Sequence, residues 1–198
     1  MKKLFTVFTL ILCASLAQAE VVDKVVAVVG SDIITLSDVQ KFKSEKSKTK
    51  DKLSVGTNIT TNNADALQAL IDQKLIEQEM DRLQVAATPE DVNSAVQEVL
   101  QRNKATLEEL KRELASKNTS FENYKKQLAT QIRRMKFMGQ VIYPRIKIAE
   151  GEVSKKAANS TDEARFHARM LILEERAPDE LEKYLSEVRA KTLVEIKK

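Results

Sequence analysis

Few side chains in this sequence have the types and spacing that catalysis or metal binding requires. The chain of 198 residues has one histidine and one cysteine, His167 and Cys13. A lone histidine cannot form a histidine-based metal cluster, so we interpret His167 as a packing or surface residue. The four glycines are too dispersed to form a phosphate-binding loop. The sequence therefore predicts no catalytic residue, no metal site and no cofactor.

Four methionines are the remaining chemical signal, because they fall on otherwise apolar stripes. Methionine is flexible and polarisable, so it fills irregular gaps in a core and also adapts to varied partners at a binding surface. Spacing alone favours the core, and a binding role stays open as the alternative. The four are Met80, Met135, Met138 and Met170.

Residues 1–19 have the three parts of a secretory signal peptide: two lysines, an apolar run over 4–16, and small residues ending at Ala19. We expect cleavage before Glu20, which would remove Cys13 and lower the net charge from +4 to +2. An uncleaved membrane anchor is the alternative, but the apolar run is shorter than the roughly 20 residues that span a bilayer.

The composition of the remaining chain limits its partners. A surplus of two charges is too small to predict a nucleic-acid partner. No segment after the leader is apolar enough to predict a membrane span. Tryptophan is absent and charged residues make up 31% of the chain, which indicates an aliphatic core and a highly charged surface.

Helical patterns follow two short β-branched runs. Residues 25–29 and 33–35 flank Gly30-Ser31-Asp32, a sequence typical of a hairpin loop. Ser37 then resembles a helix N-cap, with Gln40 three residues later. We expect Pro144 to end the longest helix, because proline disfavours helix in the residue before it. Start signals for later helices are Asn63, Thr88-Pro89, Thr106 with Glu109, and Thr119 with Glu122.

The C-terminal segment has two possible structures. "RFHARMLIL" ends in a strand-like pattern, and Pro178 is expected to open the last helix. "KTLVEIKK", residues 191–198, alternates apolar and charged residues and could continue that helix or form a strand. A lone hairpin is marginal in water. We therefore predict a mainly α-helical fold with a small β-sheet, formed by the N-terminal hairpin and a C-terminal strand.

Longer stretches resemble one known family. "VVDKVVAVVGSDIITLSDV" after a signal peptide is similar to the start of mature SurA-type periplasmic chaperones. "ALIDQKLIEQEMDRLQV", followed by "TPEDVNSAVQEVLQRNKATLEELKRELASKNTSFENYKKQLATQI", is similar to the helical remainder of their N-terminal domain. The match covers most of residues 21–155, and the order of the pieces is its specific part.

Fuller members of the family carry parvulin-type prolyl isomerase domains next. Here only about fifteen residues separate Ile148 from Arg165, whereas a domain needs about 50. "RMLILEERAPDELEKYLSEVRAKTLVEI" resembles the C-terminal segment of the chaperone core. The resemblance thus implies one core over residues 20–198, in which 164–198 complete 20–155 and isomerase domains are absent.

The resemblance also implies a function. It predicts an ATP-independent periplasmic chaperone, a holdase that binds unfolded outer-membrane polypeptides and assists their folding and assembly. A residual prolyl isomerase and an adaptor for one dedicated envelope partner are the alternatives. If the apolar stripes line a groove, its candidate peptide-binding residues are Met80, Met135, Met138, Ile142, Tyr143 and Met170.

Overall fold

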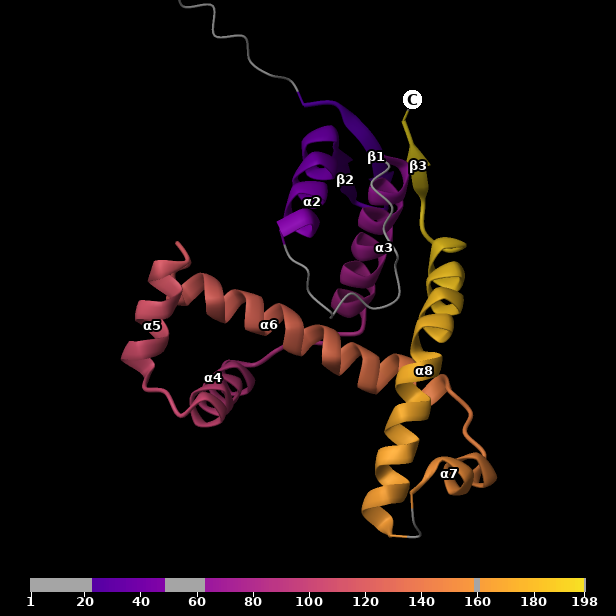
Figure 1. Ribbon diagram of the computed structural model, residues 1–198. Coiled ribbons are helices and arrows are strands. Elements are labelled where there is room, and N and C mark those ends of the chain that lie inside the picture. The colour runs from indigo at the N-terminus through magenta and orange to yellow at the C-terminus, as the bar shows by residue number, and fades with distance from the viewer. Residues whose placement is uncertain (1–22, 49–62, 159–160, 198) are drawn as a thin grey trace, which may run out of the picture.

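The computed structural model describes residues 23–48, 63–158 and 161–197, so the predicted signal peptide and its cleavage site at Ala19–Glu20 lie outside the described residues. The prediction of a mainly helical fold with a small sheet is confirmed (Figure 1). The elements are β1 (Val25–Val29), β2 (Asp32–Thr35), α2 (Leu36–Lys48), α3 (Asn63–Arg82), α4 (Pro89–Asn103), α5 (Leu107–Ser116), α6 (Phe121–Phe137), the π-helical turn η1 (Met138–Ile142), the 3-10 turn η2 (Tyr143–Arg145), α7 (Glu150–Lys156), α8 (Asp162–Arg189) and β3 (Val194–Ile196).

The sheet has the order β2-β1-β3, and both pairings are antiparallel. Val29 of the central strand lies opposite Asp32 of β2 and opposite Val194 of β3. In Figure 1 the yellow C-terminal strand lies beside the indigo N-terminal hairpin. Residues 194–196 are therefore strand, which resolves the choice between strand and helix for the C-terminal segment. The predicted closure of the hairpin by the C-terminus is confirmed.

The hairpin turn is tied to α3 through one glutamine. Gly30 has a φ of +56°, a conformation that glycine adopts without the steric cost of a Cβ atom. The Gln78 side-chain amide donates to the Val29 carbonyl and to the Asp32 carboxylate, both at 2.8 Å. These bonds fix the turn against the helix that covers the inner face of the sheet.

The main core lies between this sheet face, α3 and the C-terminal half of α8. Ala27 and Val29 of β1 are fully buried against it. The rings of Phe137 and Tyr184 meet edge to face, with centroids 5.8 Å apart, and so join α6 to α8. Other buried members of this main core are Ile34, Val39, Ala66, Leu70, Ile71, Leu75, Met80, Val85, Ile142 and Val188.

Two of the predicted helix starts are confirmed in detail. Thr88 caps α4 in a capping box with Asp91, and Pro89 occupies the first turn. Thr106 caps α5 in a second box with Glu109. Such reciprocal bonds satisfy backbone donors that the first turn of a helix leaves unpaired.

Two other predicted caps were wrong by one or two residues. The helix after the hairpin begins at Leu36, because Thr35 and Asp38 exchange the capping bonds that were expected from Ser37 and Gln40. Ser120 caps α6 in place of Thr119, and its hydroxyl accepts from the Asn123 backbone amide at 3.1 Å.

The strand-like interpretation of "RFHARMLIL" was also wrong, as was the helix start at Pro178. Both lie inside α8, which continues from Asp162 to Arg189. A proline inside a helix costs about 3 kcal/mol. Burial on both sides of the proline offsets this cost, because Ile172 packs in a second cluster against α7 while Tyr184 packs in the main core.

We expect Gly30→Ala to lower the melting temperature, with a loss of roughly 1–3 kcal/mol in stability. A Cβ atom at Gly30 would add strain at positive φ and lie 2.9 Å from Gln78 Oε1, which would disturb the two bonds of that amide. Thermal denaturation followed by circular dichroism measures the effect. Gly151→Ala is the matched control, since nothing lies within 4 Å of its added Cβ. Equal melting of the two variants would contradict this account of the turn.

We also expect removal of residues 191–198 to destabilise the whole fold. The truncation takes away β3, the hydrogen-bonded neighbour of β1, which is the strand that carries the buried residues Ala27 and Val29. Each fully buried aliphatic side chain contributes about 1.5–3 kcal/mol, against a total stability of about 5–15 kcal/mol. Urea denaturation should show a lower midpoint, whereas a chain ending at Lys197 should unfold like the full chain. An unchanged midpoint in the longer truncation would show that β3 is dispensable.

Candidate functional site

The six predicted peptide-binding residues occupy different depths in the structure. Met80 and Ile142 are 2% and 0% exposed and belong to the main core. Met138 is half-buried and packs against that core. Tyr143 and Met170 are also half-buried, whereas Met135 is 63% exposed on α6. In this conformation only Met135 is broadly accessible, and the peptide-binding role of the set stays a prediction.

The π-helical turn explains why this stripe divides. In a regular α-helix, Met135 and Ile142 are seven residues apart and would share one face. The i→i+5 pattern of η1 widens the turn over residues 138–142, which changes the rotation of the residues that follow. Ile142 therefore lies in the core while Met135 faces outward. Apolar periodicity alone does not reveal such a turn.

A pocket of about 450 Å³ lies between the C-terminal end of α3, the connection to α4 and the middle of α6. Small alanine side chains from both sides leave this space open, and the chain segment Val85–Ala87 forms one side of it. The residues that line it are Met80, Asp81, Gln84, Val85, Ala86, Ala87, Ala129, Thr130 and Arg133. Of the predicted set it contains only Met80. The pocket could not be predicted from the sequence, because only the tertiary contact of α6 with the α3–α4 connection creates it.

Two basic side chains of α6 hold the pocket together. Arg133 Nε donates to the Val85 carbonyl at 2.7 Å, and its guanidinium pairs with Asp81. Lys136 donates to the Ala86 carbonyl at 3.2 Å and pairs with Asp91, whose pKa this contact lowers. Both bases thus satisfy carbonyl groups of a connection that has no regular structure.

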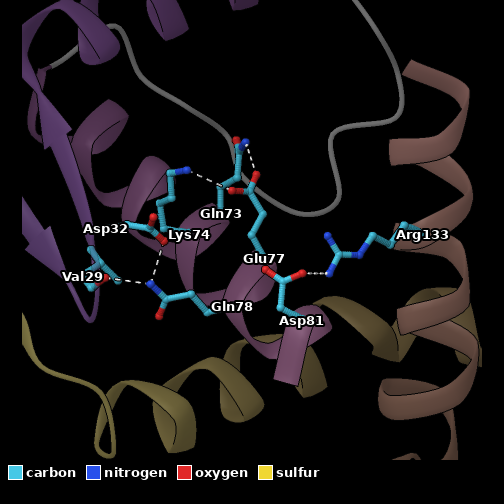
Figure 2. Close-up of polar contacts among 8 residues, drawn as sticks. All are labelled: Val29, Asp32, Gln73, Lys74, Glu77, Gln78, Asp81 and Arg133. Carbon is cyan, nitrogen blue, oxygen red and sulfur yellow. Dashed lines mark hydrogen bonds and ion pairs between the residues drawn. The ribbon is translucent and has the colours of Figure 1, made fainter. Parts of the chain in front are cut away.

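Polar side chains continue along α3 from the pocket to the hairpin. The Gln73 amide donates to the Glu77 carboxylate at 2.8 Å, and Lys74 pairs with the same carboxylate at 3.1 Å. Figure 2 shows both side chains directed to Glu77. The same view shows Gln78 bonded to the hairpin and Asp81 bonded to Arg133 of α6. This row therefore links the sheet to the α4–α6 part of the molecule. Each labelled residue takes part in at least one of these interactions, which is typical of a positioning network.

A second polar cluster connects α3 to α8. The Tyr184 hydroxyl donates to the Glu79 carboxylate at 2.6 Å, and Arg82 pairs with the same carboxylate at 2.7 Å. The Arg82 hydrogen bond is the main cause that lowers the pKa of Glu79, against the opposing effect of burial. Burial, and then the hydrogen bond to Glu79, raise the pKa of Tyr184 to about 12. This cluster holds α8 in the position from which β3 reaches the sheet.

Several large apolar side chains outside the predicted set are accessible on the helices. Phe166 is 67% exposed on the N-terminal half of α8, and Leu171 and Leu83 are partly exposed. His167 also lies exposed on this half of α8. In residues 23–48, 63–158 and 161–197, no group of three or more potential ligand side chains could hold a metal ion. Over the same residues, no helix has the length and apolar character to cross a membrane.

Residues 22–137 match the family model described as the SurA N-terminal domain, which is more than half of the chain. The chain belongs to the SurA N-terminal domain family. The resemblance drawn from the sequence is therefore confirmed. The matched residues include the hairpin, α3, the pocket and all of α6, whereas α7, α8 and β3 lie beyond the match.

Individual relatives agree with the family assignment. The chain is 32% identical over 136 residues to Chaperone SurA of Bordetella avium, covering 67% of this chain and 26% of the relative. It is 27% identical over 176 residues to Chaperone SurA of Vibrio vulnificus, covering 87% of this chain and 41% of the relative. The chain therefore spans between a quarter and about two fifths of the length of these SurA proteins.

A solved structure has the same fold. The match comes from work on PEB4 and the periplasmic protein Cj1289, described as two structurally related SurA-like chaperones of Campylobacter jejuni. The TM-score is 0.64 at 14% sequence identity, and the match covers 89% of this chain and 100% of the other. It extends the likeness to most of the chain.

We expect Tyr184→Phe to lower stability by about 1.5–3 kcal/mol near neutral pH, since it removes a hydrogen bond to a charged carboxylate. Because folding raises this pKa from 10 to about 12, the contribution of Tyr184 is complete below pH 10 and is lost as the pH rises toward 12. Urea denaturation across this range should show the loss in the parent chain and a smaller one in the variant. Tyr143→Phe is the control. Parallel pH profiles for parent and Tyr184→Phe would contradict the assignment.

Proposed function

We propose that this protein is an ATP-independent periplasmic holdase for unfolded outer-membrane polypeptides. Its match to the SurA N-terminal domain is the observation that carries this proposal. The leader-like segment before Glu20 supports the location, as does the fold likeness to a structure from work on the periplasmic protein Cj1289 and PEB4. In this proposal the mature chain, residues 20–198, acts as one chaperone core, with residues 164–198 completing the part formed by 20–155.

The distribution of apolar side chains supports reversible holding. Outer-membrane polypeptides have strands that alternate apolar and polar residues, and before folding they expose both. Met135, Phe166 and Leu171 offer separate apolar contacts among charged residues on helix surfaces. We propose that Met135 is the principal client contact of the predicted set. The half-buried residues Met138, Tyr143 and Met170 would add partial contacts, and the buried residues Met80 and Ile142 would support the surface from the core. Contacts of this kind need no nucleotide and no fixed client sequence.

Two other functions remain as alternatives. A residual prolyl isomerase has less support, because the nearest match to the histidine of a parvulin first strand is Arg169, which lies in α8 and pairs with Glu150. An adaptor for one envelope partner would use the same fold and the same exposed residues. Crosslinking in the native envelope separates these functions: a holdase captures many outer-membrane proteins, an adaptor one stoichiometric partner.

Light scattering of a urea-unfolded porin, diluted with and without the protein, tests the proposal. We expect suppression of aggregation without ATP. We also expect it to persist at high salt, because the proposed contacts are apolar, whereas binding through exposed charges is screened beyond about 10 Å at 0.1 M. Met135→Asp should weaken suppression by about tenfold or more in the required concentration, since burying a methionine contributes about 1.5–3 kcal/mol and each 1.4 kcal/mol is about tenfold.

Gln131→Asp is the matched control, because it places the same carboxylate at another exposed position of α6. Both variants should melt like the parent chain. Equal aggregation with and without the parent protein would refute the holdase function. Suppression that disappears at high salt would assign binding to the lysine-rich run over residues 41–52. Equal loss in both variants would remove Met135 from the client-binding surface.

A further inference from the structure

The outer edge of β3 carries backbone groups that point away from the sheet. The Gly30 amide donates to the Leu193 carbonyl at 2.8 Å, and the Lys197 amide donates to the Val26 carbonyl at 2.9 Å. Alternate residues of an antiparallel strand face the same neighbour. Residues 193, 195 and 197 therefore turn their N–H and C=O groups toward β1. Val194 and Ile196, which lie between them, turn theirs outward.

This edge has no partner in the part of the chain that the structure describes. β3 is an outer strand of the sheet, and no other described strand pairs with it. Among the described residues, no hydrogen bond to the outward backbone groups of Val194 and Ile196 is present. The side chains beside the edge are also accessible, since Leu193 is 69% and Ile196 is 58% exposed. The edge therefore offers up to four main-chain hydrogen bonds next to apolar surface.

Proteins usually protect such an edge, because an exposed apolar edge strand is a template for another extended chain. Here the protection is partial. The strand is only three residues long, and Glu195 pairs with Lys197 at 2.7 Å on the face opposite to Ile196. A short edge flanked by charges limits the length of an added strand but leaves the donors and acceptors of Val194 and Ile196 open.

We propose that the outer edge of β3 binds an extended segment of an unfolded polypeptide as a fourth strand of the sheet. This inference rests on the proposed holdase function and adds the mode of recognition. The occupant is a strand-forming segment of the client, in which apolar and polar residues alternate, as in the strands of outer-membrane barrels. Main-chain hydrogen bonds give affinity that does not depend on sequence, and Leu193 and Ile196 add contact with apolar client side chains. With so few hydrogen bonds, release stays rapid.

The register suggests a specific variant. Ile196→Pro removes the outward N–H group while Glu195 and Lys197 keep their pairing with β1, and proline is tolerated at an edge when its nitrogen faces solvent. Ile196→Ala is the matched control, because it shortens the side chain but keeps the N–H group. The probe is a fluorescent ten-residue peptide of alternating apolar and polar residues, and anisotropy measures its binding to the purified full chain.

We expect Ile196→Pro to weaken peptide binding about fivefold relative to Ile196→Ala, which corresponds to the loss of one hydrogen bond. A second peptide with N-methyl groups on consecutive residues, which block both edges of the extended chain, should bind the parent protein more weakly than the unmodified peptide. Equal binding of the two peptides to the parent protein would overturn the proposal, and this comparison holds even if Ile196→Pro is destabilised. Equal affinities of two folded variants would overturn it as well.

Two further outcomes distinguish failure of the β3 edge as a site from failure of the holdase function. If the parent protein suppresses porin aggregation but does not distinguish the two peptides, the holdase function stands and the edge is not its site. If it neither suppresses aggregation nor binds the peptide, the proposed function itself fails. Sedimentation velocity tests a second copy as the occupant. A dimer that Ile196→Pro abolishes, with peptide binding unchanged, would overturn the proposal in favour of self-association through β3.

Discussion

The antiparallel pairing of β1 with β3 joins opposite ends of the chain, and the arrangement of the helices depends on it. β1 is the central strand, so Ala27 and Val29 are fully buried only when both neighbours and α3 are in place. To deliver β3 to this position, α8 must run beside α3 (Figure 1). The contacts of Tyr184 with Glu79 and of Arg189 with Asp72 fix that path. The small sheet thereby connects the N-terminal hairpin to the last helix.

The parts of the fold that could be predicted from sequence have local causes. The loop at Gly30 and the capping boxes at Thr88 and Thr106 each depend on residues within a few positions of one another. The closing strand could also be predicted, because a lone hairpin needs a further neighbour. The continuous α8 could not, since packing in two separate clusters outweighs the local signal of Pro178. For the same reason the pocket beside Arg133, which depends on a distant contact, was missed.

The candidate peptide-binding site depends on which of the predicted residues are exposed in the folded structure. The apolar stripe that includes Met135 and Ile142 looks continuous in the sequence. The π-helical turn divides it, so that Ile142 lies in the core and Met135 lies exposed at the surface. Family membership supports a chaperone function, whereas the exposed residues support a physical mode of weak apolar contact. The open edge of β3 would add main-chain recognition to that contact. In the proposed function, both kinds of contact are reversible and depend little on client sequence.

In the proposed function, the protein holds unfolded clients on the surface of its folded state. Hydrogen–deuterium exchange, measured by mass spectrometry with and without an unfolded porin, tests this most directly. We expect slower exchange in residues 193–197 and at the C-terminal end of α6, with β1 and α3 unchanged. Faster exchange in β1 and α3 on client binding would contradict it, because the core would then open to receive the client. No change in any segment would contradict it equally.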